Sequence, residues 1–264
     1  MNIVGMAHMA KDLKLDEHHD QHTDEGGCSL PTIDCLIKTR VWHMIYIVEL
    51  IVGGPQGMML MNNFRKWLTV IGRMDYVATT ESIDFNYSYP LLNQNDPEYK
   101  ISQQLAPLLS AIRMVRDSII IFKSMSKRKK DWAIDPGYLD HNARYDRWTK
   151  ELPDYLKVRY PEDGSAPDIA SHYVANLHSY FQLCIIMHHR PQLIAYAENV
   201  SEPWQKVMLI CSAAAKKICR LQEAILEGSG VPGFLAMQRG INFLIYSVLT
   251  SVMIHMVRKS RLMP

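Results

Sequence analysis

Most of the chain repeats its apolar residues with the spacing of an α-helix, and this periodicity constrains the fold more than any other feature. The clearest run begins after Pro203 and stops before Gly228. Its apolar members are Trp204, Val207, Met208, Cys211, Ala214, Ala215, Ile218, Leu221 and Ile225. Because a helix of 3.6 residues per turn places them all on one side, that side is expected to face a core. Pro203 suits the first turn of such a helix, and Gly228 suits the position past its end.

Similar patterns separated by breakers predict helices along the rest of the chain. The expected helices are residues 1–15, 35–52, 99–124, 139–152, 169–188, 203–227 and 235–257. Asp34 and Asp168 stand where a side chain can cap a helix N-terminus, and Gly53-Gly54-Pro55 ends the second helix. Residues 58–97 are expected to be irregular, since their apolar pieces are mixed with Tyr, Asn and Pro. The prediction is an all-α fold, a single domain of roughly eight helices over residues 1–264.

Composition narrows the class of protein. The 264 residues are 48% hydrophobic and 21% charged, which suits a chain with a sizeable core. A net charge of +2 gives no global reason to expect binding to nucleic acid or to an acidic membrane. The odd count of five cysteines favours reduced thiols in the cytosol or nucleus. Cys28 and Cys35 form an isolated pair, which cannot build a zinc site alone.

Five short motifs follow one another in an order that resembles a known family. They are Met6 to Leu13; Arg40, Trp42 and Glu49 with Gly53-Gly54-Pro55; Arg147-Trp148 to Leu152-Pro153; His172-Tyr173 to His189-Arg190-Pro191; and Cys211 to Ala215. Together they resemble the fungal-specific transcription factor domain, the all-α middle homology region of Zn2Cys6 regulators. The resemblance covers about residues 1–225. The family commonly has Asp at the position of Glu49 and Gly-Arg-Pro at the position of Gly53-Gly54-Pro55.

The resemblance implies a regulatory region that controls RNA polymerase II transcription in the nucleus without touching DNA itself. Zinc and DNA binding would belong to an N-terminal finger that this chain lacks, and no cofactor is expected in the chain. The family domain also begins before Met1 and is followed by more chain after Pro264. Partners implied are a second copy, a transcriptional co-regulator or a small-molecule effector. The motif residues are expected to be structural, with Trp42 and Trp148 as apolar anchors and Arg190-Pro191 ending a helix.

Residues 58–72, MMLMNNFRKWLTVIG, resemble no part of that family, whose pattern would pass from Gly57 directly to Arg73. The genetic code permits a GTATG splice donor at Gly57-Met58, a branch point at Leu68-Thr69 and an AG acceptor at Ile71-Gly72. We therefore hypothesise a retained intron in the gene model. A lineage-specific insertion is the alternative. Messenger RNA reads that run continuously through these codons in all transcripts would exclude the intron.

Two charged clusters have alternative interpretations. Lys127-Arg128-Lys129-Lys130 fits a nuclear-import signal, a nucleic-acid contact or a solvated loop. Residues 16–25 combine His18, His19 and His22 with five acidic side chains. A helix would bring His18 and His22 together as metal ligands, but the polarity and the following glycines favour a solvated loop.

An enzymatic function is not expected, because the chain contains no nucleophile elbow, HExxH, P-loop or Rossmann motif. No catalytic, cofactor-binding or metal residue is assigned. One alternative is a small all-α metal-dependent enzyme that uses the region around His18 and His22. Another is a membrane-associated helical protein, since residues 241–257, INFLIYSVLTSVMIHMV, approach the length of a membrane span. A buried core helix is favoured for that segment because it contains five polar side chains, and no membrane partner is expected.

Overall fold

The computed structural model describes residues 9–15, 17–18, 21, 28–31, 33–42, 44–45, 95, 107–111, 113–114, 117–118, 121, 135–196, 201–236 and 241–262. Of these residues 82% are helical and none lies in a strand, which confirms the all-α prediction. The chain divides into two compact units, residues 1–110 and 111–264, and each is described by itself. The single domain therefore stays a prediction. The expected irregular segment 58–97 and the insert 58–72 lie outside the described residues, apart from Asn95.

In the first unit, helical backbone is found at residues 9–12 and 33–42. Its buried apolar side chains among the described residues are Ala10, Leu15, Cys35, Leu36, Trp42, Ile45 and Leu109. The second helix includes Ile33, and the backbone N–H of Cys35 donates to the carbonyl of Pro31 at 2.9 Å. Asp34 therefore lies in the first turn and does not cap the helix, contrary to the sequence-based expectation. An acidic side chain in a first turn still interacts favourably with the helix dipole.

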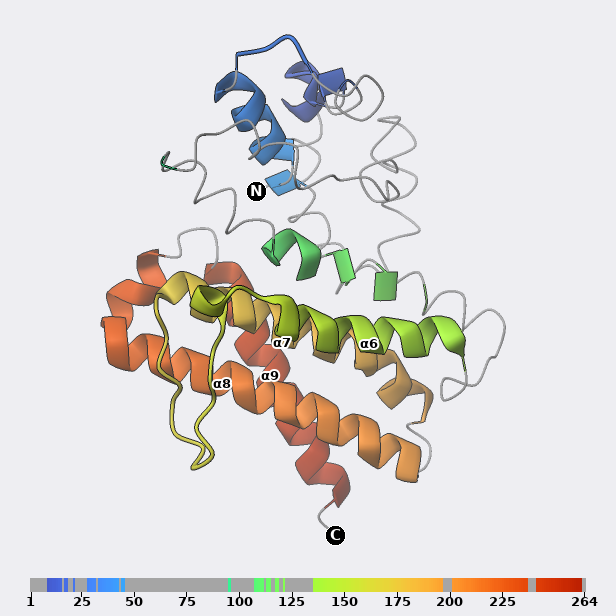
Figure 1. Ribbon diagram of the computed structural model, residues 1–264. Coiled ribbons are helices and arrows are strands. Elements are labelled where there is room, and N and C mark those ends of the chain that lie inside the picture. The colour runs from blue at the N-terminus through green and yellow to red at the C-terminus, as the bar shows by residue number, and fades with distance from the viewer. Residues whose placement is uncertain are drawn as a thin grey trace. The chain divides into compact units, whose positions relative to one another are not determined.

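The second unit contains α6 (Pro136–Glu151), the short 3-10 helix η1 (Asp154–Leu156), α7 (His172–Ala195), α8 (Glu202–Ala236) and α9 (Ile241–Leu262). As Figure 1 shows, α7 packs along α8, and α8 packs along α9. The long loop between η1 and α7 returns onto the first of these pairs. There Val158, Tyr160 and Ile169 cover a buried cluster formed by Ala175, Leu221 and Ile225. This loop therefore closes one end of the α7–α8 core.

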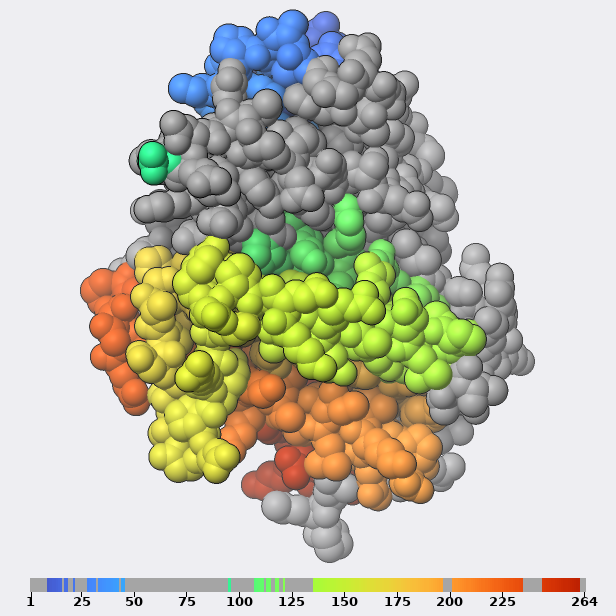
Figure 2. Space-filling model, viewed as in Figure 1, coloured from blue at the N-terminus to red at the C-terminus, as the bar shows by residue number. Residues whose placement is uncertain are grey.

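The boundaries of α6 follow from its sequence. The Asp135 carboxylate accepts a hydrogen bond from the backbone N–H of Tyr138 at 3.1 Å, and Pro136 occupies the first turn. The helix ends at Glu151, and its C-cap Leu152 is followed by Pro153, so it stops before the proline as predicted. The inner face carries Tyr138, His141, Tyr145 and Trp148. In Figure 2 the outer face of α6, in yellow-green, lies on the visible surface of the second unit.

Both predicted ends of α7 are wrong. The helix is capped by Ser171, whose hydroxyl accepts from the backbone N–H of Val174 at 3.3 Å, so Asp168 lies outside it. It also continues through Pro191 to Ala195 instead of stopping there. An internal proline costs about 3 kcal/mol through a lost hydrogen bond and a steric clash. Burial of Gln192 and Leu193 beyond it offsets that cost, which local sequence rules could not show.

The apolar stripe predicted for residues 203–227 is confirmed, since every member of it is buried along α8. The predicted end of this helix at Glu227 is wrong. The helical backbone passes Gly228 and is interrupted at Gly230, where φ is +61° and ψ is −163°. Such a positive φ suits glycine alone among common residues, because a Cβ would strain the backbone. Pro232 lies two residues further on, and helical backbone continues as far as Ala236.

Candidate functional site

Two tryptophans of the motifs that carry the family resemblance, Trp42 and Trp148, are buried. Trp148 stacks on Phe181, with ring centroids 4.1 Å apart and planes inclined by 10°. Trp42 is buried in the first unit, and Arg40 is half-buried on the same helix. Glu49, Gly53, Gly54, Pro55 and Lys127-Arg128-Lys129-Lys130 lie outside the described residues.

The His-Arg-Pro motif has a different role from the one expected. Because α7 continues past it, Arg190 is not placed at a helix end to collect unpaired carbonyls. Its side chain is exposed, whereas His189 is buried. Nδ1 of His189 lies 2.8 Å from the hydroxyl of Tyr138, which donates to Gln192 at 2.7 Å. The motif therefore attaches α7 to α6.

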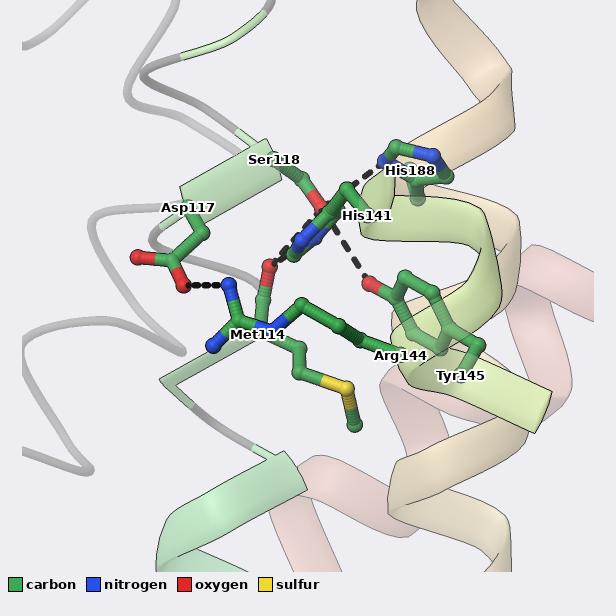
Figure 3. A network of polar contacts seen from close by, with 7 residues as sticks. All are labelled: Met114, Asp117, Ser118, His141, Arg144, Tyr145 and His188. Atoms are coloured by element: carbon green, nitrogen blue, oxygen red, sulfur yellow. Dashed lines mark hydrogen bonds and ion pairs between the residues drawn. The ribbon is translucent and has the colours of Figure 1, made fainter. Parts of the chain in front are cut away.

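A buried polar network centred on Ser118 lies beside that contact (Figure 3). Ser118 Oγ is 2.9 Å from Nε2 of His141 and 3.1 Å from the hydroxyl of Tyr145, both on α6. It is also 2.9 Å from Nδ1 of His188 on α7. Asp117 and Arg144 form an ion pair of 2.9 Å at the more exposed edge of the network. The network thus links three helical segments through one hydroxyl.

The acceptors in this network determine where the protons lie. Nε2 of His141 is 2.9 Å from the carbonyl of Met114, which can only accept, so Nε2 carries the proton. Nε2 of His188 is 2.9 Å from Oδ1 of Asn142 and donates to it. Nδ1 of His188 then carries no proton and lies 2.9 Å from Ser118 Oγ, whose hydroxyl donates to the carbonyl of Met114 at 2.8 Å. Both imidazoles are accordingly neutral, and Nδ1 of His141 is buried without a hydrogen-bond partner.

Burial keeps these rings neutral. It lowers the pKa of His188 to about 2, with smaller contributions from the charges of His189 and His141. Burial also lowers the pKa of His189 to about 4 and, to a lesser extent, that of His141. A positive charge placed on any of these rings would lose its hydration without gaining an acidic partner of its own.

Ser118, His188 and Asn142 are aligned like a nucleophile, its base and the group that orients the base. Their environment opposes catalysis. A base with a pKa of about 2 has little tendency to remove a hydroxyl proton near neutral pH. Ser118 is also buried, and its hydroxyl lies 2.8 Å from the carbonyl of Met114 in its own helical segment. The arrangement is better explained as a structural cross-link between α6, α7 and the helical segment that carries Ser118.

The most unusual surface of the second unit is on α9, which buries two serines and exposes large apolar side chains. The buried face of this helix contains Ser247 and Ser251, both 0% exposed, and Ile254. Each serine hydroxyl donates to a carbonyl of its own helix, at 2.8 Å and 2.9 Å. Small side chains allow a close approach to neighbouring helices, and these internal hydrogen bonds satisfy the buried hydroxyls.

The opposite face of α9 carries large apolar side chains with no cover. Their exposed fractions range from 47% to 60%, and they are Ile245, Leu249, Val252, Met253 and Met256. We call these five residues the α9 stripe. The sequence favoured a buried core helix here, and that expectation is wrong for this face. Contiguous apolar surface of this kind usually marks an interaction site. Its spacing was visible in the sequence, but which face would be buried was not.

No helix in the described part of the chain is long and apolar enough to cross a membrane. The α9 stripe is also confined to one face, whereas a spanning helix meets lipid on most of its circumference.

The expected solvated loop at residues 16–25 is wrong at His18. This side chain is buried, and its Nε2 lies 3.4 Å from Sγ of Cys28. His19 and His22 lie outside the described residues, so the alternative of a metal site at His18 and His22 is not tested.

All five cysteines are described, and none forms a disulfide. Cys184 lies on α7, and Cys211 and Cys219 lie on α8, apart in sequence from Cys28 and Cys35. A Zn2Cys6 finger needs six closely spaced cysteines, so these residues do not fit one.

Comparisons with protein-family models, with curated proteins and with solved structures find no match to this chain.

Proposed function

We propose that this chain is the regulatory, non-DNA-contacting region of a fungal Zn2Cys6-type transcription factor, acting in the nucleus on RNA polymerase II transcription. The resemblance of its ordered motifs supports the class. DNA would be contacted only through a finger outside this chain. The observation that carries the proposal further is the α9 stripe, which fits a surface for pairing with a second copy of the chain.

The spacing of the α9 stripe favours another helix as its occupant. Ile245, Leu249, Val252 and Met256 recur at intervals of four, three and four residues, the pattern of an interhelical seam. The same stripe on a second copy offers a matching surface without any further partner. A two-fold axis produces such a self-complementary contact.

Charge favours an antiparallel pair. The last turn of α9 carries Lys259 and Arg261, and parallel pairing would place two such turns side by side. In an antiparallel pair centred between Leu249 and Val252, the two basic turns lie roughly 25 Å apart at 1.5 Å rise per residue. That separation exceeds the Debye length of about 8 Å at physiological salt, so the repulsion is screened.

The seam is short, which sets the expected affinity. Stable specific interfaces bury about 1,200–2,000 Å² in total, more than five side chains from each copy supply. We therefore expect a dissociation constant on the order of micromolar for the isolated chain. Attachment to adjacent DNA sites would raise the effective concentration and strengthen the pair.

The test uses the chain fused to an unrelated monomeric DNA-binding domain and a reporter with paired half-sites. We expect the fusion to occupy the paired sites and change transcription more than the DNA-binding domain alone does. Leu249→Glu should reduce that change and shift the unfused chain toward monomer in sedimentation equilibrium. A buried glutamate in the seam would lose hydration without a partner.

Leu226→Glu is the matched control, because Leu226 is an equally exposed leucine on α8. It should leave both the reporter and the association state unchanged. A wild-type fusion indistinguishable from the DNA-binding domain alone would refute the regulatory role. A chain that stays monomeric up to high micromolar concentration would refute the pairing surface.

A further inference from the structure

In the first unit, three side chains with metal-binding atoms meet in one place. A ring nitrogen of His18 and the Sγ atoms of Cys28 and Cys35 all lie within 4.8 Å of one another. His18 and Cys35 are each 3% exposed, and Cys28 is half-buried. The cluster joins residues that are well separated along the chain. We propose that His18, Cys28 and Cys35 bind a zinc ion.

The separations suit a shared ion. Zinc binds imidazole nitrogen at about 2.0–2.1 Å and thiolate sulfur at about 2.3 Å, so tetrahedral geometry places the two ligand atoms about 3.5 Å apart. The distance from Nε2 of His18 to Sγ of Cys28 is 3.4 Å. The third ligand atom lies within 4.8 Å of both, so it needs to approach by no more than about 1 Å for the same geometry.

The ligand types select the ion. Two thiolates and one imidazole suit a borderline or soft cation, whereas calcium and magnesium prefer oxygen. Among the borderline and soft cations that these three ligands could bind, zinc is redox-inert. A redox-inert ion is consistent with cysteines that form no disulfide. On binding, the thiol protons of Cys28 and Cys35 pass to solvent and both sulfurs coordinate as thiolates.

Neighbouring residues support the ligands. Leu15 lies one helical turn before His18 and is buried, and Leu36 is buried beside Cys35. The Thr39 hydroxyl donates to the carbonyl of Cys35 at 2.9 Å within the second helix. Cys28 is the most accessible ligand, so the fourth coordination position is expected to face solvent on its side. The ion would therefore join helical residues 17–18 to the helix that contains Cys35.

This site is separate from the zinc of the family's DNA-binding finger. It uses a histidine and two cysteines of this chain, and it lies in the unit that does not contain the α9 stripe. The inference does not depend on the proposed function and would hold for any role of the chain.

The experiment measures metal in the full chain, purified under reducing conditions from zinc-supplemented medium. We expect a single zinc ion per chain by mass spectrometry of the metal content. Cobalt substitution should give thiolate-to-cobalt charge-transfer absorption. Cys28→Ser should abolish both signals, and because Cys28 is half-buried this variant is expected to fold. His18→Gln is the second ligand variant.

Cys219→Ser is the matched control, since Cys219 is also half-buried but lies on α8. It should retain zinc at the wild-type level, with circular dichroism confirming that all variants are folded. Three results would overturn the proposal. They are zinc far below stoichiometry in the wild type, equal zinc in Cys28→Ser and wild type, and a Cys28–Cys35 disulfide that forms while no metal is retained.

Discussion

α8 and α9 are neighbouring helices that orient their apolar side chains in opposite ways. They run in opposite directions, since Arg261 near the end of α9 lies over the ring of Trp204 at the start of α8, 5.7 Å from its centroid. α8 buries a continuous stripe of large residues, among them Trp204, Met208 and Leu221, although Leu209, Ile210 and Leu226 are exposed. α9 buries Ser247 and Ser251 together with Ile254, and exposes the five large residues of the α9 stripe.

The difference shows that apolar content does not decide which face of a helix is buried. α8 supplies the volume that fills the core, so a helix packed against it gains from small side chains that permit close contact. The serines of α9 meet this requirement because their hydroxyls bond to their own helix. Its large residues are then left on the outside, where they gain stabilisation only if a partner covers them.

The comparison is tested first by two matched leucine truncations, one of which is expected to have the largest effect on stability. Leu221→Ala on α8 should lower the free energy of unfolding by about 2–5 kcal/mol, because Leu221 is fully buried and the change leaves a cavity. Leu249→Ala on α9 should change it by less than about 0.5 kcal/mol. Urea denaturation at low protein concentration, where α9 is uncovered, measures both. Similar losses from the two variants would contradict the assignment of α9's outer face.

A second test uses acid pH to distinguish the α6–α7 layer, which contains the buried imidazoles, from the α8–α9 pair. Burial holds the pKa of His188 and His189 at about 2 and about 4, below the ordinary value of about 6.5. Their contribution to stability is therefore complete above about pH 6.5 and is lost as the pH falls below it. Lowering the pH from 7.5 to 5.5 should cost about 1.4 kcal/mol for each ring, or roughly 3 kcal/mol together.

Hydrogen exchange checks where the acid effect begins, and we expect α6 to lose protection before α8. His188→Gln should flatten the dependence of the unfolding free energy on pH. His255→Gln is the control, because His255 is exposed on α9 and outside the network. If the unfolding free energy of His188→Gln depends on pH as steeply as that of the wild type, the His188 ring is not the source of the acid sensitivity.

The smallest effect concerns the inner face of α9. Ser251→Leu should lower the free energy of unfolding by about 1–3 kcal/mol, because a fully buried position would be overpacked. Ser251→Ala should be nearly neutral, since the lost hydrogen bond lies within the helix and alanine has the higher helix propensity. Thermal unfolding of the two variants compares them. Tolerance of leucine would mean that the two helices are not closely packed here.

The sequence anticipated helices more reliably than it anticipated their ends. The buried stripe of α8 was predictable because nine residues agree on one face and outweigh any local exception. Pro191 and Gly228 were misjudged, because local rules assign a cost to these residues but cannot show what packing lies beyond them. The contact of His18 with two cysteines could not be predicted, since it joins residues that no local pattern relates.

Sequence alone determined that this chain is helical and which side of α8 faces a core, because both follow from periodicity within one segment. Only the tertiary structure decided that α9 turns its serines inward, that α7 runs through Pro191, and that His188 sits between Ser118 and Asn142. These outcomes depend on the volume and hydrogen-bonding groups that other segments bring to each position. Such information is not contained in the local order of residues.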